Sequence, residues 1–160
     1  MMDIQPETVT HPVLPPQGWL ATLTDQERIL FSSFGETIQL KQQQILIQEG
    51  QAQPYFFFIT EGMLSVRRGD IVVAVVGSGE FLGEMTIVTN GAASATVTTL
   101  EACSVWRMSH EKLMKFIYEH HEIGIKLLLT LLSTVSERLQ TVNSDLADLL
   151  AERRKQTQVS

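Results

Sequence analysis

The sequence predicts a mainly β protein with flanking helices, in which short antiparallel strands form a roll or barrel and one long helix follows. From Gly35 to Met108, short apolar runs alternate with glycine turns, which is typical of such an antiparallel fold. After His121, apolar residues recur at steps of three and four, which is typical of an amphipathic helix. The chain has 160 residues, of which 44% are hydrophobic, and this fits one domain with a full core.

The first part of the chain separates into an arm and a short helix. Residues 1–17 hold four of the five prolines and no apolar period, so we expect a flexible N-terminal arm. Thr24 and Glu27 form a capping box, which predicts a helix that ends near Ser33. The residues expected to be buried by this helix are Ile29, Leu30 and Phe34.

Seven strands are expected between the two helical regions. Their ranges are 37–40, 44–48, 55–59, 63–67, 71–76, 94–100 and 103–108. Phe56, Phe57 and Phe58 cannot all face one side of a strand, because side chains alternate. Either the flanking helices cover the second face, or these aromatics form a patch that binds a partner.

The C-terminal region is predicted to be helical in two pieces. Ser109 is expected to cap a first helix, His120 and His121 mark a bend, and a second helix runs to about Arg153, roughly 50 Å at 1.5 Å per residue. The steps of three and four form the heptad pattern of a coiled-coil seam. The seam residues are Ile125, Leu128, Leu132, Val135, Leu139, Val142, Leu146 and Leu149.

Two arrangements of this helix are possible from its pattern. It lies either on its own domain or against a second copy of the chain. A helix of this length extends beyond what one small roll can cover, so we expect a parallel homodimer. The domain organisation is then an arm (1–17), a roll with flanking helices (18–120), a dimerisation helix (121–153) and a tail (154–160).

The stretch 81–97 carries the most specific motif. Gly83, Glu84 and Met85 follow a short strand, and Ser94, Ala95 and their neighbours Thr96 and Val97 begin the next one. This stretch resembles the phosphate-binding cassette of the cyclic nucleotide-binding domain, the effector module of catabolite activator protein. The resemblance covers roughly residues 23–149. It implies a jelly-roll-like β-roll, or double-stranded β-helix, with a long C-terminal dimerisation helix.

One residue departs from the family pattern. Where the family has an arginine that neutralises the cyclic phosphate, this chain has Ala93. Removing one partner of a buried charge pair costs about 3–5 kcal/mol, or roughly two to three and a half decades in affinity. No Lys or Arg lies between Arg68 and Arg107 to replace it, although a cation from a distant part of the chain is compatible with the sequence.

The other cassette residues therefore have two interpretations each. Glu84 either accepts a hydrogen bond from a ribose hydroxyl, as the resemblance implies, or stabilises the start of a helix as a dipole partner; we favour the second. Ser94 is either a phosphate ligand or the first residue of a strand, and we favour the strand. The vestigial pocket comprises Gly83, Glu84, Met85, Ala93, Ser94 and Ala95.

Composition excludes several classes of function. The net charge of −6 disfavours nucleic acid, and about seven residues follow Arg153, so we expect no DNA binding. No signal sequence or membrane span is predicted, and we expect a cytoplasmic protein. Cys103 is predicted to be buried and inert, and the four histidines are not spaced as metal ligands. We therefore expect no metal, no cofactor and no catalytic residues.

The sequence thus favours a non-enzymatic dimeric scaffold or adaptor in signalling. In this hypothesis the chain has lost both nucleotide and DNA binding and acts through another signalling protein. The alternative is a small-molecule sensor that binds cyclic AMP or cyclic GMP weakly, or a different ligand, in the same pocket.

Overall fold

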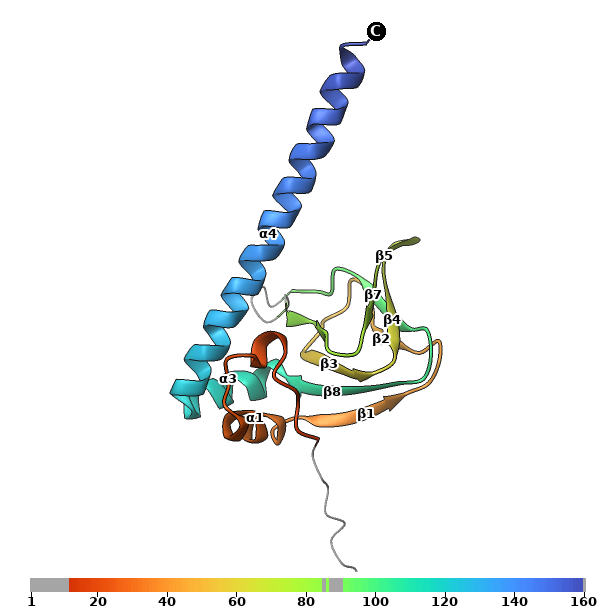
Figure 1. The fold of residues 1–160 in the computed structure, drawn as a ribbon. Coiled ribbons are helices and arrows are strands. Elements are labelled where there is room, and N and C mark those ends of the chain that lie inside the picture. The colour runs from red at the N-terminus through yellow and green to blue at the C-terminus, as the bar shows by residue number, and fades with distance from the viewer. Residues whose placement is uncertain (1–11, 85, 87–90, 160) are drawn as a thin grey trace, which may run out of the picture.

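The computed structural model describes residues 12–84, 86 and 91–159, and its centre is a roll of two four-stranded antiparallel sheets (Figure 1). The strand order is β1-β8-β3-β6 in the first sheet and β2-β7-β4-β5 in the second. The strands are β1 (Glu36–Leu40), β2 (Ile45–Ile47), β3 (Tyr55–Glu61), β4 (Met63–Arg68), β5 (Ile71–Gly77), β6 (Phe81–Leu82), β7 (Thr96–Thr99) and β8 (Cys103–Ser109). Each expected strand is present, and the predicted mainly β roll is confirmed.

The glycine turns place consecutive strands beside each other. Gly62 joins β3 to β4 with a φ of 100°, in the left-handed region that favours glycine. A Cβ atom at Gly62 would lie 2.5 Å from Cys103 Sγ and 2.9 Å from the Ala102 carbonyl oxygen. This turn therefore requires glycine for both its backbone conformation and its close contact with β8.

The three adjacent phenylalanines of β3 are all buried, and they divide between two clusters. Phe56 and Phe58 belong to a cluster between the first sheet and the helices, which we call the helix-side core. Phe57 belongs to a second cluster between the two sheets. The prediction that the flanking helices cover the second face of β3 is confirmed, and the alternative of an exposed aromatic patch at these residues is wrong.

The N-terminal segment is more tightly packed than predicted. Leu14 is fully buried in the helix-side core, its N–H donates to Ser32 Oγ at 2.9 Å, and its carbonyl accepts from Arg28 Nη1 at 3.0 Å. The expected flexible arm is therefore wrong at Leu14, because a proline-rich segment can still dock through one apolar side chain. The remainder of the arm, residues 1–11, lies outside the described residues.

The first α-helix begins as its capping box predicts. After a 3₁₀ turn, η1 (Gly18–Leu20), helix α1 (Asp25–Ser32) starts with Thr24 Oγ1 accepting from the Glu27 N–H, while Glu27 Oε1 accepts from the Thr24 N–H. The predicted burial is wrong for Ile29, whose side chain is exposed. Phe31 is buried in its place, because α1 turns that side toward Trp106 of β8.

Two helices follow the roll. Helix α3 (His110–Glu119) is capped by Ser109, whose Oγ accepts from the Lys112 N–H at 3.1 Å. His120 forms the predicted bend, and α4 runs over His121–Thr157. The predicted tail is wrong up to Thr157: α4 continues four residues beyond Arg153, because charged and glutamine side chains favour the helix and basic ones suit its C-terminus.

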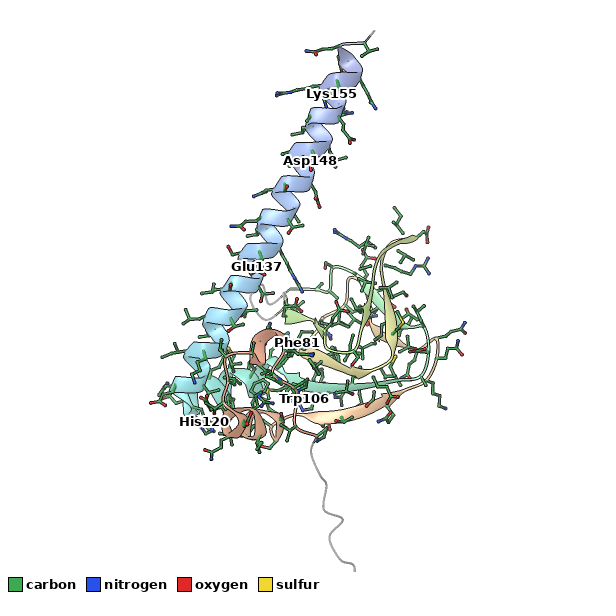
Figure 2. The ribbon with its side chains drawn as sticks, in the orientation of Figure 1. Phe81, Trp106, His120, Glu137, Asp148 and Lys155 are labelled. Atoms are coloured by element: carbon green, nitrogen blue, oxygen red, sulfur yellow. The ribbon has the colours of Figure 1, made fainter. Side chains whose placement is uncertain are left out.

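Helix α4 contacts the roll only along its first half. Ile123, Leu127 and Leu131 are buried in the helix-side core. The second half stands clear of the roll, as the positions of Asp148 and Lys155 show (Figures 1 and 2). None of the helices in the described ranges is long and apolar enough to cross a lipid bilayer.

Most of the predicted seam is uncovered in the single chain. Val135 packs partly against the helix-side core. The exposed seam residues are Ile125, Leu128, Leu132, Leu139, Val142, Leu146 and Leu149. The arrangement in which α4 lies on its own domain therefore holds for the first half of the helix and not for the second.

An ion pair between α1 and α4 leads to a prediction about acid stability. The pKa of Glu27 is lowered because Lys126 Nζ donates to Glu27 Oε1 at 2.6 Å and the Thr24 N–H donates to the same carboxylate. Such a carboxylate contributes stability that is present above its usual pKa of 4.5 and is lost as the pH falls through its folded pKa. We expect Glu27→Gln to lower the free energy of unfolding at pH 7, and this difference to shrink below pH 4.5. Urea unfolding at pH 7 and pH 3 measures it.

The matched control is Glu111→Gln. Glu111 lies in the first turn of α3 and makes no ion pair with another residue of the described chain. This variant should show little change in stability at either pH. An equal loss of stability at pH 7 and pH 3 in Glu27→Gln would contradict the assignment.

Candidate functional site

A cavity of about 230 Å³ lies where the cassette, the second sheet and α4 meet. Its apolar walls come mainly from the strands and consist of Ile47, Val66, Val76, Phe81, Leu82, Ala93, Ala95 and Val97. Its polar lining consists of Gln53, Glu80, Glu84, Thr86, Ser94 and Arg138, with the backbone of Gly83. The cavity therefore includes five of the six predicted pocket residues. The sixth, Met85, lies outside the described residues.

The cassette starts at a glycine that is held against β3. Gly83 has a φ of 81°, and a Cβ atom there would lie 2.7 Å from the Tyr55 carbonyl oxygen. Thr86 Oγ1 donates to the Gly83 carbonyl at 2.8 Å. This geometry directs Glu84, which follows immediately, into the interior of the protein. The predicted short helix after Gly83 lies largely outside the described residues.

Glu84 is almost fully buried, with 2% of its surface exposed. Its Oε1 atom is in direct contact with Nη1 of Arg138, which extends from α4 and is about half exposed. The pairing accounts for the burial of a carboxylate, because an unpaired buried charge is strongly unfavourable. Glu84 thus connects the cassette to the long helix.

Arg138 is the residue that sequence reasoning missed. The sequence leaves room for a cation from a distant part of the chain but does not identify it, and in the structure it comes from the middle of α4. A local signal exists, because Arg138 directly precedes the seam residue Leu139 and therefore lies on a flank of the seam. The sequence does not give the rotation of α4 relative to the roll, so this contact could not be predicted.

Ala93 lies in the wall of the cavity, with 6% of its surface exposed. Its backbone is fixed to the turn before β3: the Gly50 N–H donates to the Ala93 carbonyl at 2.8 Å, and the Ala93 N–H donates to the Gln51 carbonyl at 2.9 Å. A methyl group therefore occupies the position at which the family pattern has a guanidinium, and it offers no charge to a ligand.

The two residues after Ala93 differ in exposure. Ser94 is exposed at the cavity and lies two residues before β7, so the prediction that it leads the strand is wrong. β7 starts only at Thr96, whose Oγ1 accepts from the Glu49 N–H at 3.1 Å. Ala95 is partly buried and also contributes to the wall.

The charges of the cavity are separated into an interior and a rim. In the interior, Glu84 and Arg138 neutralise each other. At the rim, Glu80 is exposed, and its Oε2 accepts from the Gly77 N–H at 2.6 Å. Among the described lining residues, two carboxylates therefore face a single guanidinium, and the lining carries a net charge of −1.

The described residues outside the cavity do not form a metal site or a site with a reactive thiol. Within the described ranges, no group of three or more His, Cys, Asp or Glu side chains is placed to hold a metal ion. Cys103 is buried as predicted, and burial raises the pKa of its thiol. A thiol with a raised pKa is a poor nucleophile at neutral pH.

The fold and the cavity together define a class of protein. A two-sheet β-roll, a cassette that begins at Gly83 and a long C-terminal helix that reaches the cavity are the features of a jelly-roll ligand-binding domain. The sequence model of the cyclic nucleotide-binding domain matches residues 37–120, which is more than half of the chain. The chain therefore belongs to the cyclic nucleotide-binding domain family.

Known proteins support this assignment at the level of the fold. The catabolite activator protein of Thermus thermophilus is 20% identical, with a TM-score of 0.76, and the match covers 86% of this chain and 63% of that one. The N-terminal domain of a transcriptional regulator from Streptomyces coelicolor A3(2) is 24% identical, with a TM-score of 0.68, and the match covers 82% and 90% of the two chains.

A curated relative is similar over a shorter range. A cGMP-dependent protein kinase of Eimeria tenella is 27% identical over 92 residues, which are 57% of this chain and 9% of the kinase. The chain thus spans about a tenth of that relative and less than two thirds of the Thermus protein. Members of this domain family are typically regulatory and not catalytic.

Proposed function

We propose that the chain is a non-enzymatic regulatory scaffold that forms a homodimer, does not bind cyclic nucleotides and acts through another signalling protein in the cytoplasm. The observation that carries this proposal is the charge of the cavity. Arg138, the sole cation among the described lining residues, is already paired with Glu84. A cyclic phosphate would therefore lack a free counter-charge.

The energetics support a loss of nucleotide affinity. A phosphate that enters the cavity gives up hydration, which is unfavourable unless a cation or several hydrogen-bond donors replace it. The methyl group of Ala93 cannot do so, and recruiting Arg138 would leave the carboxylate of Glu84 buried and unpaired. The missing contact corresponds to about 3–5 kcal/mol.

Dimerisation and a protein partner are supported by two separate features. The exposed apolar seam of α4 has the heptad spacing of helices that pair in parallel. The net charge of −6 disfavours nucleic acid as the partner, because electrostatic attraction to phosphates supplies most non-specific affinity. We therefore propose a protein as the output partner.

The nucleotide part of the proposal is tested by isothermal titration. We expect the wild-type chain to show no saturable binding of cyclic AMP or cyclic GMP at micromolar concentrations. We expect Ala93→Arg to bind at least one of them about a hundredfold or more tightly than the wild type, because one charge-assisted contact is worth two decades or more. The matched control is Ala92→Arg, which adds the same charge at an exposed residue that is not among those lining the cavity, and it should bind as weakly as the wild type.

Saturable micromolar binding of either cyclic nucleotide to the wild type would show the proposal to be wrong. It would favour the second candidate function, a small-molecule sensor. The presence of a guanidinium in the cavity favours that candidate, since Arg138 would then exchange Glu84 for the phosphate. Arg138→Gln distinguishes the two, because it abolishes nucleotide binding only if Arg138 contacts the ligand.

A further inference from the structure

We propose that His110 is a pH-sensitive switch: a proton taken up by its imidazole loosens the junction between α3, β3 and the start of the cassette at Gly83. The inference goes beyond the proposed function, because it requires neither a dimer nor a protein partner nor a cyclic nucleotide. It rests on the position of the imidazole, on the aromatic rings in contact with it and on the charges around it.

The imidazole of His110 lies where α3, β3 and the cassette meet. His110 is the first residue of α3, and its backbone N–H donates to the Pro54 carbonyl, directly before β3, at 2.8 Å. The ring lies near the carbonyl groups of Gly83 and Tyr55. Its Nε2 atom is buried and has no hydrogen-bond partner within the described chain. A proton that binds this ring therefore places a charge between three elements that are in close contact.

Three ring contacts connect His110 to the wall of the cavity. The His110 ring stacks on Phe56, with 6.4 Å between centroids and 12° between the ring planes. Phe56 stacks on Trp19 at 5.1 Å, and Trp19 stacks on Phe81 at 5.2 Å. Phe81 lines the cavity and lies two residues before Gly83. A displaced imidazole therefore alters contacts that extend to the start of the cassette.

Protonation of this ring is unfavourable in the folded chain. Burial lowers the pKa of His110 below its usual value of 6.5, because a charged imidazole would lose its hydration there. The carbonyl groups of Gly83 and Tyr55 act in the opposite direction, and their combined effect is smaller than that of burial. The first turn of a helix is also an unfavourable place for a cation, because the helix dipole is positive at that end. A protonated His110 is therefore more stable outside the junction, in water.

The charged and titratable groups around His110 do not offset this cost. They are Glu111 and Lys112 of α3, Tyr55 of β3, Arg107 of β8 and Glu84 of the cassette. Glu111 is exposed, and the Glu84 carboxylate is already paired with Arg138. Residues 85–90 include no charged or titratable side chain. The pKa of His110 is thus set by burial and by two neutral carbonyl groups, without a contribution from an opposite charge.

The lowered pKa gives the direction of the pH dependence. The unfolded or opened chain takes up the proton as the pH falls below 6.5, while the closed junction takes it up only at a lower pH. The contribution of His110 to the closed junction is therefore complete above pH 6.5 and is lost as the pH falls from 6.5 toward the pKa of the folded state. Within this window, the equilibrium constant for closing falls by up to about tenfold per pH unit.

The experiment follows the junction in the wild-type chain at about pH 7.5 and about pH 5.5. Hydrogen–deuterium exchange, corrected for the intrinsic pH dependence of amide exchange, reports local opening at residues 81–84 and in the first turn of α3. We expect protection from exchange in these segments to be at least about fivefold lower at the acid pH. This window lies above the pH at which the Glu27 carboxylate is protonated, so that ion pair does not contribute to the change.

Two variants assign the effect to one histidine. His110→Gln keeps a polar side chain that does not titrate, and its protection should differ by less than about twofold between the two pH values. The matched control is His121→Gln, which removes an exposed histidine at the first residue of α4 and should keep the pH dependence of the wild type. Circular dichroism identifies a variant that fails to fold, and the measurement on the wild type does not depend on a variant.

Three results would overturn the inference. The first is equal protection of the wild-type cassette at both pH values. The second is a folded His110→Gln variant that keeps the pH dependence of the wild type, and the third is a His121→Gln variant that loses it. Each of these results leaves the proposed function intact, because the titrations with cyclic nucleotides test that function separately.

Discussion

Gly35→Ala is expected to destabilise the fold by about 3 kcal/mol or more, which is at the upper end for overpacking in a core. A Cβ atom at Gly35 would lie 2.2 Å from two ring atoms of Trp106 and 2.6 Å from the Arg107 carbonyl oxygen. The Trp106 ring has no room to move away from the added Cβ atom. Trp106 is fully buried, its Nε1 donates to the Ser32 carbonyl at 3.1 Å, and its ring packs against Phe31 at 5.4 Å between centroids.

Urea unfolding at a fixed protein concentration measures this effect, since the stability of an oligomer depends on concentration. The matched control is Gly77→Ala. Gly77 also has an ordinary φ, but the nearest atom to its added Cβ lies 3.6 Å away. We expect the control to change the free energy of unfolding by less than about 1 kcal/mol. Similar midpoints for the two variants would show that the contact between Gly35 and Trp106 is not rigid.

The parts of the fold that the sequence predicts correctly are those with a local physical signal. The capping box of Thr24 and Glu27 defines the start of α1, because both of its hydrogen bonds lie within four residues. Gly62 marks the turn between β3 and β4, because its φ of 100° favours glycine. Such signals require no knowledge of distant contacts.

The predictions that were wrong concern residues whose burial depends on how helices and strands pack together. The sequence of α1 is compatible with burial of either Ile29 or Phe31. Phe31 is the buried one because α1 packs with that side against Trp106. Leu14 is buried only because α1 and β8 form a receiving surface. No local pattern reports either relation.

The candidate site shows the same division. The start of the cassette at Gly83 and the position of Ala93 follow from the motif. The pairing of Glu84 with Arg138 does not, because it requires the path of α4 over the roll. That pairing changed the interpretation of the cavity, from a site without a cation to a site whose cation is already bound.

The second large effect concerns the seam of α4. We expect the double variant Leu139→Glu with Leu146→Glu to be a monomer of 17.9 kDa by light scattering, while the wild type has twice that mass. Leu139 and Leu146 are seven residues apart and therefore occupy the same heptad position. They are 59% and 53% exposed in the single chain, so the roll does not cover them.

The physical reason is the repulsion between like charges that face each other in a buried seam. In a parallel pair of helices, each residue at such a position faces its own copy, so each substitution places two carboxylates together without a partner. The lost apolar burial adds to this, since a fully buried Leu contributes about 1.5–3 kcal/mol. The substitutions at Leu139 and Leu146 together should raise the dissociation constant of the dimer by at least a thousandfold.

The control places the same charges beside the seam. Gln140→Glu with Ala147→Glu has the same seven-residue spacing and adds the same charge, one residue later along an exposed part of α4. We expect this variant to retain the mass of the wild type. In the seam variant, the second half of α4 should also lose helical circular dichroism, because a helix without a packing partner is marginally stable in water. A seam variant that keeps both its mass and its helicity would remove the basis for dimerisation through α4, since no other face of the distal helix presents an unbroken apolar stripe.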